Sequence, residues 1–447
     1  MKAAVLGLVR GLVGLFYRRI EVSGLENLPR EGPVLLVANH NNGLVDPMVV
    51  LRALPRPVVF VAKSTLWRIP VLRALLNLLD CVPVVRKKDF LEGEKAAGPE
   101  RNEESLRRLG AALDAGGCVL IFPEGRSHSD PRLSEIRTGA ARALLLSKKS
   151  PVVLPLGLWF SEKEIFRSDV LVKVGTPVVA PADPTVEAWT QAMGAALEGV
   201  TLNADDWKDH EVVAAVDSLY GAKIREDFFE GEEEEAQLAR SLRVRQLFLE
   251  ARVALDRTHP GEVASLARRA RALDHLLRRI SLSPSSLDEP PPVSTVLWHT
   301  TKALSVIVLG FPVAVLGVLA WWIPYRLTGV IANRLPGAHE RDQIALHKIV
   351  AGVCLFPLVL TFWAAAGWYL AGPLGGALAV VFLPFAGISS LLFLEYAEGR
   401  ERQGRELLAR LFAPGAIARL RAERDALVAE FDRLAAGFRS AADNPAR

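Results

Sequence analysis

Two long stretches without a charged residue constrain this 447-residue chain more than any other feature. The first runs from Ala303 to Ile323, and the second covers 46 residues from Ile349 to Leu394. Because an α-helix rises about 1.5 Å per residue, half of the second stretch can cross a hydrocarbon core of about 30 Å. Glycines and a proline interrupt its middle. The pattern predicts two membrane-spanning helices joined by a tight turn; a buried hairpin in a soluble core is the alternative.

The positive charges around these stretches predict an orientation. The turn near Gly375 has no charge, whereas Lys and Arg residues precede and follow the second stretch. Cytoplasmic loops are enriched in Lys and Arg, so both ends of the 349–394 hairpin are expected in the cytoplasm. A full crossing by residues 303–323 would then place everything before it outside. Pro312 therefore predicts that this segment bends back as a re-entrant or interfacial element.

The remaining composition divides the chain further. The predicted parts are a membrane-surface amphipathic helix (1–20), an α/β domain (21–200), a charged helical region with a Pro-rich linker (201–292), the membrane region (293–397) and a basic amphipathic tail (398–447). The first part is not expected to be a signal peptide, because Arg10 interrupts its apolar run. In the tail, apolar residues recur at spacings of three, four and seven. This pattern predicts a short coiled coil, formed within this chain or by self-association.

Charge and cysteine content exclude several classes of protein. The formal net charge of +4 over 447 residues is too small to predict a nucleic-acid partner. Three cysteines that lie far apart offer neither a disulfide framework nor a CxxC metal site, and the histidines form no HExxH motif. No metal and no cofactor are therefore expected.

Residues 21–200 have the rhythm of one central sheet covered by helices. Short apolar runs predict buried strands at 33–39, 57–63, 81–86, 118–123, 151–160 and 170–175. Segments with helical periodicity lie between them, at 66–79, 102–113 and 139–146. The expected fold class is α/β, with a single mixed sheet flanked by helices.

Polar residues follow the first predicted strand. His40 leaves that strand, and Asp46 precedes Pro47 at the start of a helix. The Asn-Asn-Gly sequence between them permits a loop that brings the imidazole and the carboxylate together. A carboxylate holds such an imidazole in one tautomer, ready to accept a proton. The simpler interpretation is that Asp46 caps the helix, and both roles are compatible.

A second group follows the strand at 118–123, in the sequence Glu124-Gly125-Arg126-Ser127-His128. A strand-to-turn junction with Gly and Arg offers backbone donors and a guanidinium group to a phosphate or carboxylate. Arg86 ends another strand in the same way, and Arg137 precedes a further helix start. Basic residues at several strand ends predict an anion site.

Together these motifs resemble the glycerophosphate and lysophospholipid acyltransferases that have a PlsC-type domain. His40 to Asp46 resembles the first motif of that family, CVPVVR ending in Arg86 the second, FPEGRS the third and VVLPLGL the fourth. Five residues separate His40 from Asp46, where most members have four. This spacing resembles the branch that includes fungal-type glycerol-3-phosphate acyltransferases. The likeness covers roughly residues 20–180.

The resemblance implies a role for each residue. His40 would be the general base on a glycerol hydroxyl, oriented by Asp46, and the acyl group would come from an acyl thioester of coenzyme A or of a carrier protein. Arg86 and Arg126 would hold the phosphate of glycerol 3-phosphate or lysophosphatidate, and Glu124 a glycerol hydroxyl. Backbone donors near Gly125 would stabilise the oxyanion.

The resemblance also implies that Ser127 belongs to the substrate-binding residues. It further implies an enzyme on the cytoplasmic face of a bilayer that holds its lipid substrates. Two other functions remain open. Gly125 to Ser129 comes within one residue of the GxSxG elbow of serine hydrolases, with Ser127 as nucleophile. A non-catalytic lipid-binding or membrane-shaping protein would keep the same fold without turnover.

Overall fold

The computed structural model describes residues 1–84, 98–229, 237–280, 282–287, 293–335 and 341–442. The chain divides into two compact units. The first contains Met1–Asp206 and the described residues of 232–242 and 336–346, and the second contains the other described residues. The α/β domain thus recruits two short segments that lie far away in the sequence.

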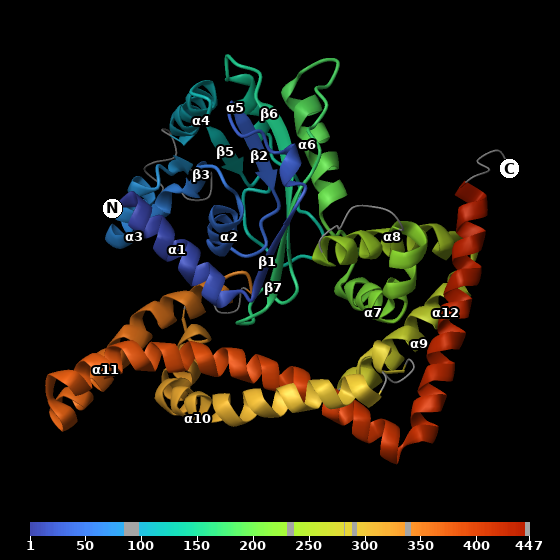
Figure 1. Cartoon of the computed structure of the whole chain (residues 1–447). Helices are drawn as coiled ribbons and strands as arrows, with labels where there is room; N and C mark the ends of the chain where they lie inside the picture. The colour runs from blue at the N-terminus through green and yellow to red at the C-terminus, as the bar shows by residue number, and fades with distance from the viewer. Residues whose placement is uncertain (85–97, 230–236, 281, 288–292, 336–340, 443–447) are drawn as a thin grey trace. The chain divides into compact units, whose positions relative to one another are not determined.

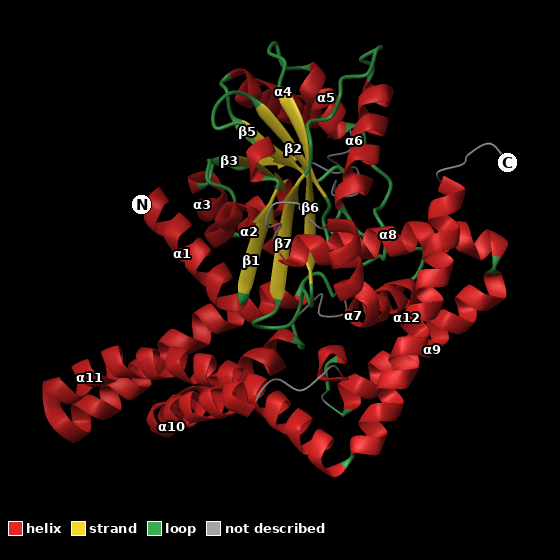
Figure 2. Ribbon diagram, turned by 45° about the vertical axis from the view of Figure 1, so that its right-hand side comes forward, coloured by secondary structure: helices red, strands yellow, loops and turns green. Residues whose placement is uncertain are grey.

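A seven-stranded sheet forms the centre of the first unit (Figure 1, Figure 2). The strands are β1 (Arg19–Ser23), β2 (Val34–Ala38), β3 (Val58–Lys63), β4 (Val82–Val84), β5 (Cys118–Ile121), β6 (Val152–Phe160) and β7 (Asp169–Val174). Their order is β1-β7-β6-β2-β5-β3-β4, and each neighbouring pair is parallel except β6 with β7. The sheet is therefore mixed, and the predicted fold class is confirmed.

Strand β2 lies in the interior of the sheet, and this position explains its composition. Leu36 pairs in register with Leu120 of β5 and with Leu154 of β6, and every residue of β2 is buried. A strand covered on both faces needs such a continuous apolar run. Strand β1 was not predicted, because it is a short edge strand whose residues are only partly buried.

Helices pack on the sheet. The apolar faces of α4 (Gly98–Asp114), α5 (Gly139–Leu145) and α6 (Val186–Val200) form one core cluster with the side chains of β2, β5 and β6. Helix α1 (Lys2–Phe16) packs against α2 (Val45–Ala53) through a face that includes Val9 and Val13, while Leu8 and Leu15 are exposed (Figure 1). The remaining described helices of this unit are η1 (Leu25–Asn27), η2 (Ser64–Arg68) and α3 (Pro70–Leu78).

The second unit is helical. The charged region predicted to form helices contains α7 (Trp207–Phe229), α8 (Gln237–Thr258, of which 237–242 belong to the first unit), α9 (Pro260–Arg279) and η5 (Pro284–Leu287). The tail, with its apolar spacings of three, four and seven, contains α12 (Pro414–Ala442). The apolar stripe of α12 is buried in this chain: Leu427 and Leu434 join one core cluster with residues of α7 and α9. Self-association through that stripe is therefore unsupported. The predicted proline linker at 290–292 lies outside the described residues.

Helices α10 (Val293–Ala332) and α11 (Ile344–Phe412) contain the uncharged stretches. Two segments, Gly310–Ala332 and Ile344–Gly399, are long and apolar enough to cross a membrane, and the most apolar window of the second is only 11% buried. A core helix of a soluble protein would be mostly buried. These helices therefore indicate a membrane-associated chain.

The break in α11 falls where the Gly and Pro residues predicted a turn. Ala371 and Gly372 have non-helical backbone angles, and a Cβ on Gly367 would lie 2.6 Å from the carbonyl oxygen of Gly375. The two arms therefore approach closely next to the break. Helix α10, in contrast, continues through Pro312 without a non-helical residue, so the expected bend and return within 303–323 does not form. A proline inside a helix removes one hydrogen bond, which a long helix can tolerate.

Candidate active site

The first part of the site is the histidine loop, residues 39–44, which connects β2 to α2. Asn39 extends the pairing of β2 with β6 through its side chain: its amide nitrogen donates to the Leu158 carbonyl oxygen (2.9 Å), and its amide oxygen accepts from the Leu158 N–H (2.7 Å). This pairing places His40 at the carboxyl end of the sheet. Gly43 has a φ of 48°, which lets the chain turn from the loop into α2.

Asp46 organises this loop. The Asp46 Oδ2 atom accepts hydrogen bonds from His40 Nδ1 (2.9 Å) and from the backbone N–H groups of Asn41 (2.9 Å) and Asn42 (2.8 Å). The helix begins at Val45, and the Asp46 carboxylate turns back to the loop that precedes it. The helix-cap interpretation therefore does not hold, and the predicted meeting of His40 with Asp46 does.

The contact with Asp46 determines which nitrogen of His40 carries the proton. A carboxylate only accepts, so Nδ1 carries the hydrogen and Nε2 is left with its lone pair. The imidazole stacks on Phe122, with ring centroids 4.1 Å apart, and its side chain is 15% exposed. His40 thus has an oriented basic nitrogen within reach of a bound molecule, while Asp46 is fully buried.

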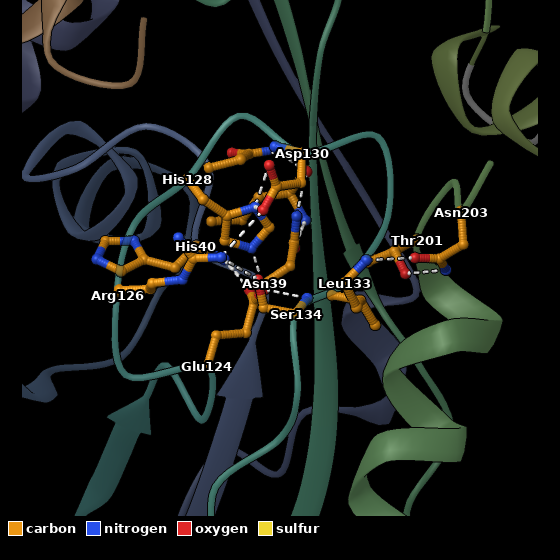
Figure 3. A network of polar contacts seen from close by, with 12 residues as sticks. Asn39, His40, Glu124, Arg126, His128, Asp130, Leu133, Ser134, Thr201 and Asn203 are labelled. Carbon is orange, nitrogen blue, oxygen red and sulfur yellow. Dashed lines mark hydrogen bonds and ion pairs between the residues drawn. The ribbon is translucent and has the colours of Figure 1, made fainter. Parts of the chain in front are cut away.

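The second part of the site is the glutamate loop, residues 122–134, which follows β5 (Figure 3). Glu124 Oε1 accepts from the backbone N–H of His40 (2.7 Å), and Oε2 contacts His128 Nε2 and the N–H of Ser134 (2.8 Å). Its side chain has no exposed area. In this structure both carboxylate oxygens contact atoms of the two loops, and the expected contact of Glu124 with a glycerol hydroxyl stays a prediction. Glu124 holds the histidine loop in place.

His128 is buried within the same network rather than at the surface. Its Nδ1 accepts from the backbone N–H of Asp130 (3.1 Å), so Nε2 carries the proton that is directed at Glu124. Neither imidazole bonds to Ser127, whose hydroxyl has no recorded hydrogen-bond partner in the described part of the chain. A serine nucleophile requires an adjacent base. The arrangement therefore offers nothing that would activate Ser127 as a hydrolase nucleophile.

The backbone donors expected near Gly125 belong to residues 125–127. The N–H of Gly125 donates to the Phe122 carbonyl oxygen (3.0 Å) and is thereby occupied. Within the described ranges, the N–H groups of Arg126 and Ser127 have no recorded acceptor. An oxyanion site near Gly125 would therefore use these two amides, and that role stays a prediction.

The predicted cations differ in their surroundings. Arg126 is about half exposed and bonds to Asp130 (3.1 Å) and Ser134 (3.2 Å), whereas Arg86 lies outside the described residues. Arg137 packs directly on Gly125: a Cβ on that glycine, whose φ is +68°, would lie 2.8 Å from Arg137 Cδ and 3.0 Å from Nε. No carboxylate among the described residues pairs with Arg137.

Two residues that support the histidine loop, Tyr17 and Lys163, were missed. The Asn42 side chain donates to Tyr17 Oη (2.8 Å), Tyr17 Oη donates to the Lys163 carbonyl oxygen (3.0 Å), and the Lys163 ammonium bonds to the loop itself. Burial raises the pKa of the Tyr17 hydroxyl well above its ordinary value, and the charge of Asp46 adds to this effect. Nothing in the local sequence marks Tyr17 or Lys163, because each reaches the site only through the fold.

Metal-binding chemistry has no evident set of ligands here. In the parts of the chain that the structure describes, no group of three His, Cys, Asp or Glu side chains could hold a metal ion. The histidines of the site each share hydrogen bonds with one carboxylate that is itself buried.

Comparison with known proteins agrees with the site. Residues 19–159 match the model of the Acyltransferase family. Glycerol-3-phosphate O-acyltransferase 2 of Saccharomyces cerevisiae is 32% identical over 134 residues, which are 27% of this chain and 18% of that protein. The 1-acyl-sn-glycerol-3-phosphate acyltransferase of Borreliella burgdorferi is 25% identical over 169 residues, 38% of this chain and 62% of that protein. The chain thus spans less than two thirds of either relative.

A solved structure is also similar, that of the 1-acyl-sn-glycerophosphate acyltransferase PlsC from Thermotoga maritima. It has 22% sequence identity and a TM-score of 0.35, and the match covers 44% of this chain and 79% of that one. The family match and the motif order agree with each other. Residues 19–159 match the Acyltransferase family, in agreement with the family that the motifs resembled.

Proposed function

We propose that this protein is a membrane-bound O-acyltransferase. It transfers a fatty acyl group from an acyl thioester, of coenzyme A or of a carrier protein, to a hydroxyl of glycerol 3-phosphate or 1-acylglycerol 3-phosphate. The observation that carries the proposal is the bond between His40 Nδ1 and the buried Asp46 carboxylate, which leaves His40 Nε2 as an oriented base. The names of the relatives support this acceptor class.

The reaction follows from that geometry. His40 Nε2 removes the proton from the acceptor hydroxyl as its oxygen attacks the thioester carbonyl carbon. Asp46 stabilises the imidazolium that forms and keeps it oriented. The N–H groups of Arg126 and Ser127 stabilise the oxyanion of the tetrahedral intermediate. When the C–S bond breaks, the departing sulfur takes the proton from His40, and an ester and a free thiol are released.

The acceptor's phosphate requires cations beside the base. Arg137 is the strongest candidate in the described part of the chain, because its guanidinium lies over Gly125, next to the residue that contacts His40. Arg126 is the second, although Asp130 competes for it. Arg86 keeps the role that the family resemblance implies.

Membrane attachment suits the substrates, since acyl chains and lysolipids partition into bilayers. The Lys and Arg residues at both ends of the 349–394 stretch favour the cytoplasmic side for those ends. We propose that the acyltransferase domain lies on the same side, where thioester donors are available. A full crossing by α10 would place that domain outside, so this orientation requires α10 to lie along the membrane surface rather than to cross the bilayer.

A panel of substrates tests the proposal. Membranes containing the wild type and the His40→Ala variant receive acyl-coenzyme A or acyl-carrier protein with glycerol 3-phosphate, 1-acylglycerol 3-phosphate or another lysolipid, and products are identified by mass spectrometry. The proposal expects one acceptor to be esterified by the wild type only. Absence of any ester from the wild type, with lipid binding retained, would favour the non-catalytic alternative.

The hydrolase alternative needs a separate experiment. A serine nucleophile would release a stoichiometric burst of thiol before any acceptor is added, and that burst would vanish in Ser127→Ala. Direct attack by the acceptor predicts no burst and substantial activity in Ser127→Ala.

A further inference from the structure

Lys163 joins the two loops of the site. It lies between β6 and β7, and its ammonium group donates to the carbonyl oxygen of Asn41 and to Ser129 Oγ, each at 2.6 Å. Asn41 belongs to the histidine loop and Ser129 to the glutamate loop. The side chain of Lys163 therefore connects both loops from outside either one.

The charges around Lys163 are consistent with this position. Burial lowers the pKa of its ammonium group, while Asp46 and Asp342 act in the opposite direction. Asp342 is 4% exposed, and its backbone oxygen would lie 3.0 Å from a Cβ on Gly43. Partial burial of a lysine is costly unless it is compensated by hydrogen bonds and opposite charges, and here both are present.

We infer that Lys163 is a positioning residue for acyl transfer, whose ammonium group clamps the histidine loop to the glutamate loop. The inference rests on the proposed function, because it requires His40 to be the base. Glu124 and His128 already connect the loops, through Glu124 Oε1 to the His40 N–H and through the His128 N–H to the His40 carbonyl oxygen (3.1 Å). Lys163 adds the connection at the next residue, and so fixes the backbone that directs Nε2 at the acceptor.

The test compares Lys163→Met, Lys163→Arg, Ser129→Ala and the double variant Lys163→Met/Ser129→Ala in full-length protein. A displacement of about 1 Å costs about 10²-fold in rate, so Lys163→Met is expected to lower kcat by about that factor with KM for both substrates nearly unchanged. Lys163→Arg, which keeps charged donors, restores part of the loss. Ser129→Ala lowers kcat less, and the double variant is no worse than Lys163→Met, because residues in one network are not additive.

The exposed Lys149 supplies the matched control, since Lys149→Met makes the same chemical change at the surface of the same unit. Hydrogen exchange adds a readout that needs no turnover: the amides of Asn41 and Asn42 should exchange faster in Lys163→Met and not in Lys149→Met. Unfolding midpoints identify any variant that is globally destabilised, in which case Ser129→Ala, which removes a single oxygen, decides.

Several outcomes overturn the inference. Unchanged kcat in folded Lys163→Met, or full additivity in the double variant, removes the clamp while leaving the acyltransferase proposal intact. Absence of acyl transfer by the wild type refutes the proposed function itself. In that case the amide hydrogen-exchange rates still test whether Lys163 holds the loops together. Equal rates at Asn41 in the wild type and in Lys163→Met would refute that role.

Discussion

Replacing Asp46 with asparagine changes one atom and a charge at the most buried part of the site. The carboxylate oxygen accepts three hydrogen bonds, from His40 Nδ1 and from the N–H groups of Asn41 and Asn42, and its side chain has no exposed area. An amide oxygen can still accept these bonds, but it carries no charge. The amide nitrogen is also a donor, which can favour the imidazole tautomer with its proton on Nε2. His40 would then have no base directed at the acceptor.

The cost to stability follows from the number of bonds. Hydrogen bonds to charged groups contribute about 1.5–3 kcal/mol and neutral ones about 0.5–1.5, so each of the three loses about 1 kcal/mol. The free energy of unfolding should therefore fall by about 3 kcal/mol. For a unit of roughly 150–250 residues, each kcal/mol lowers the midpoint by about 2–4 °C, which gives about 6–12 °C in total. The loss in kcat should be about 10²- to 10⁴-fold.

Thermal unfolding in detergent and acyl transfer by the same preparations measure both quantities. His40→Ala is the matched control, because it removes the base but leaves Asp46 bonded to the two backbone N–H groups. It should lose as much activity as Asp46→Asn at a smaller cost in unfolding temperature. The reasoning would be refuted by an Asp46→Asn variant that unfolds at the same temperature as the wild type, or whose kcat lies within tenfold of the wild-type value.

Three further predictions follow from the site and its surroundings. Glu124→Gln should lower kcat by about 10- to 10³-fold, through loss of loop position, with KM for the acceptor unchanged; a selective rise in KM would restore the substrate contact expected from the family. Gly125→Ala adds a methyl group that meets Arg137 at a position of positive φ, so it should raise the KM for the acceptor, as should Arg137→Ala. The control Gly116→Ala is strained at φ +82° but has open space around it, so it should lower only the unfolding temperature. Burial, together with the charge of Asp80, raises the pKa of the Cys81 thiol to about 11. The rate of thiol-disulfide exchange at pH 8 should therefore be about 10²-fold lower than for a free cysteine, and this rate should rise about tenfold per pH unit. A rate that levels off near pH 8.5 would contradict this prediction.

Much of the fold could be predicted because its strands are covered on both faces. Continuous apolar runs such as that of β2 identify themselves in the sequence, and helical periodicity marks the segments between them. Strand β1 was not predicted, because an edge strand is only partly buried and therefore lacks a continuous apolar run. The contribution of residues 237–242 to the first unit was not predicted either. There Glu21 of β1 accepts from the N–H groups of Leu238 and Ala239 (2.7 and 2.9 Å), a contact that no local pattern encodes.

The site was predictable where chemistry and local geometry coincide. His40 and Asp46 are close in sequence, so the loop between them decides their contact, and Asn-Gly residues signal that loop. Glu124 was expected at a strand end, where it lies, but its contacts with His128 and Ser134 were not predicted, because both partners reach it only through the path of the loop. Lys163 was not predicted at all. A lysine in a loop is ordinarily solvated, and only the tertiary fold brings this one to Asn41.

The single-turnover rate of ester formation tests the role of His40 most directly when thioester and acceptor both saturate the enzyme. In that regime neither binding nor product release contributes to the rate. If His40 is the general base, His40→Ala forms the ester about 10²- to 10⁴-fold more slowly than the wild type at equal occupancy. A rate within tenfold of the wild type would show that another group removes the proton.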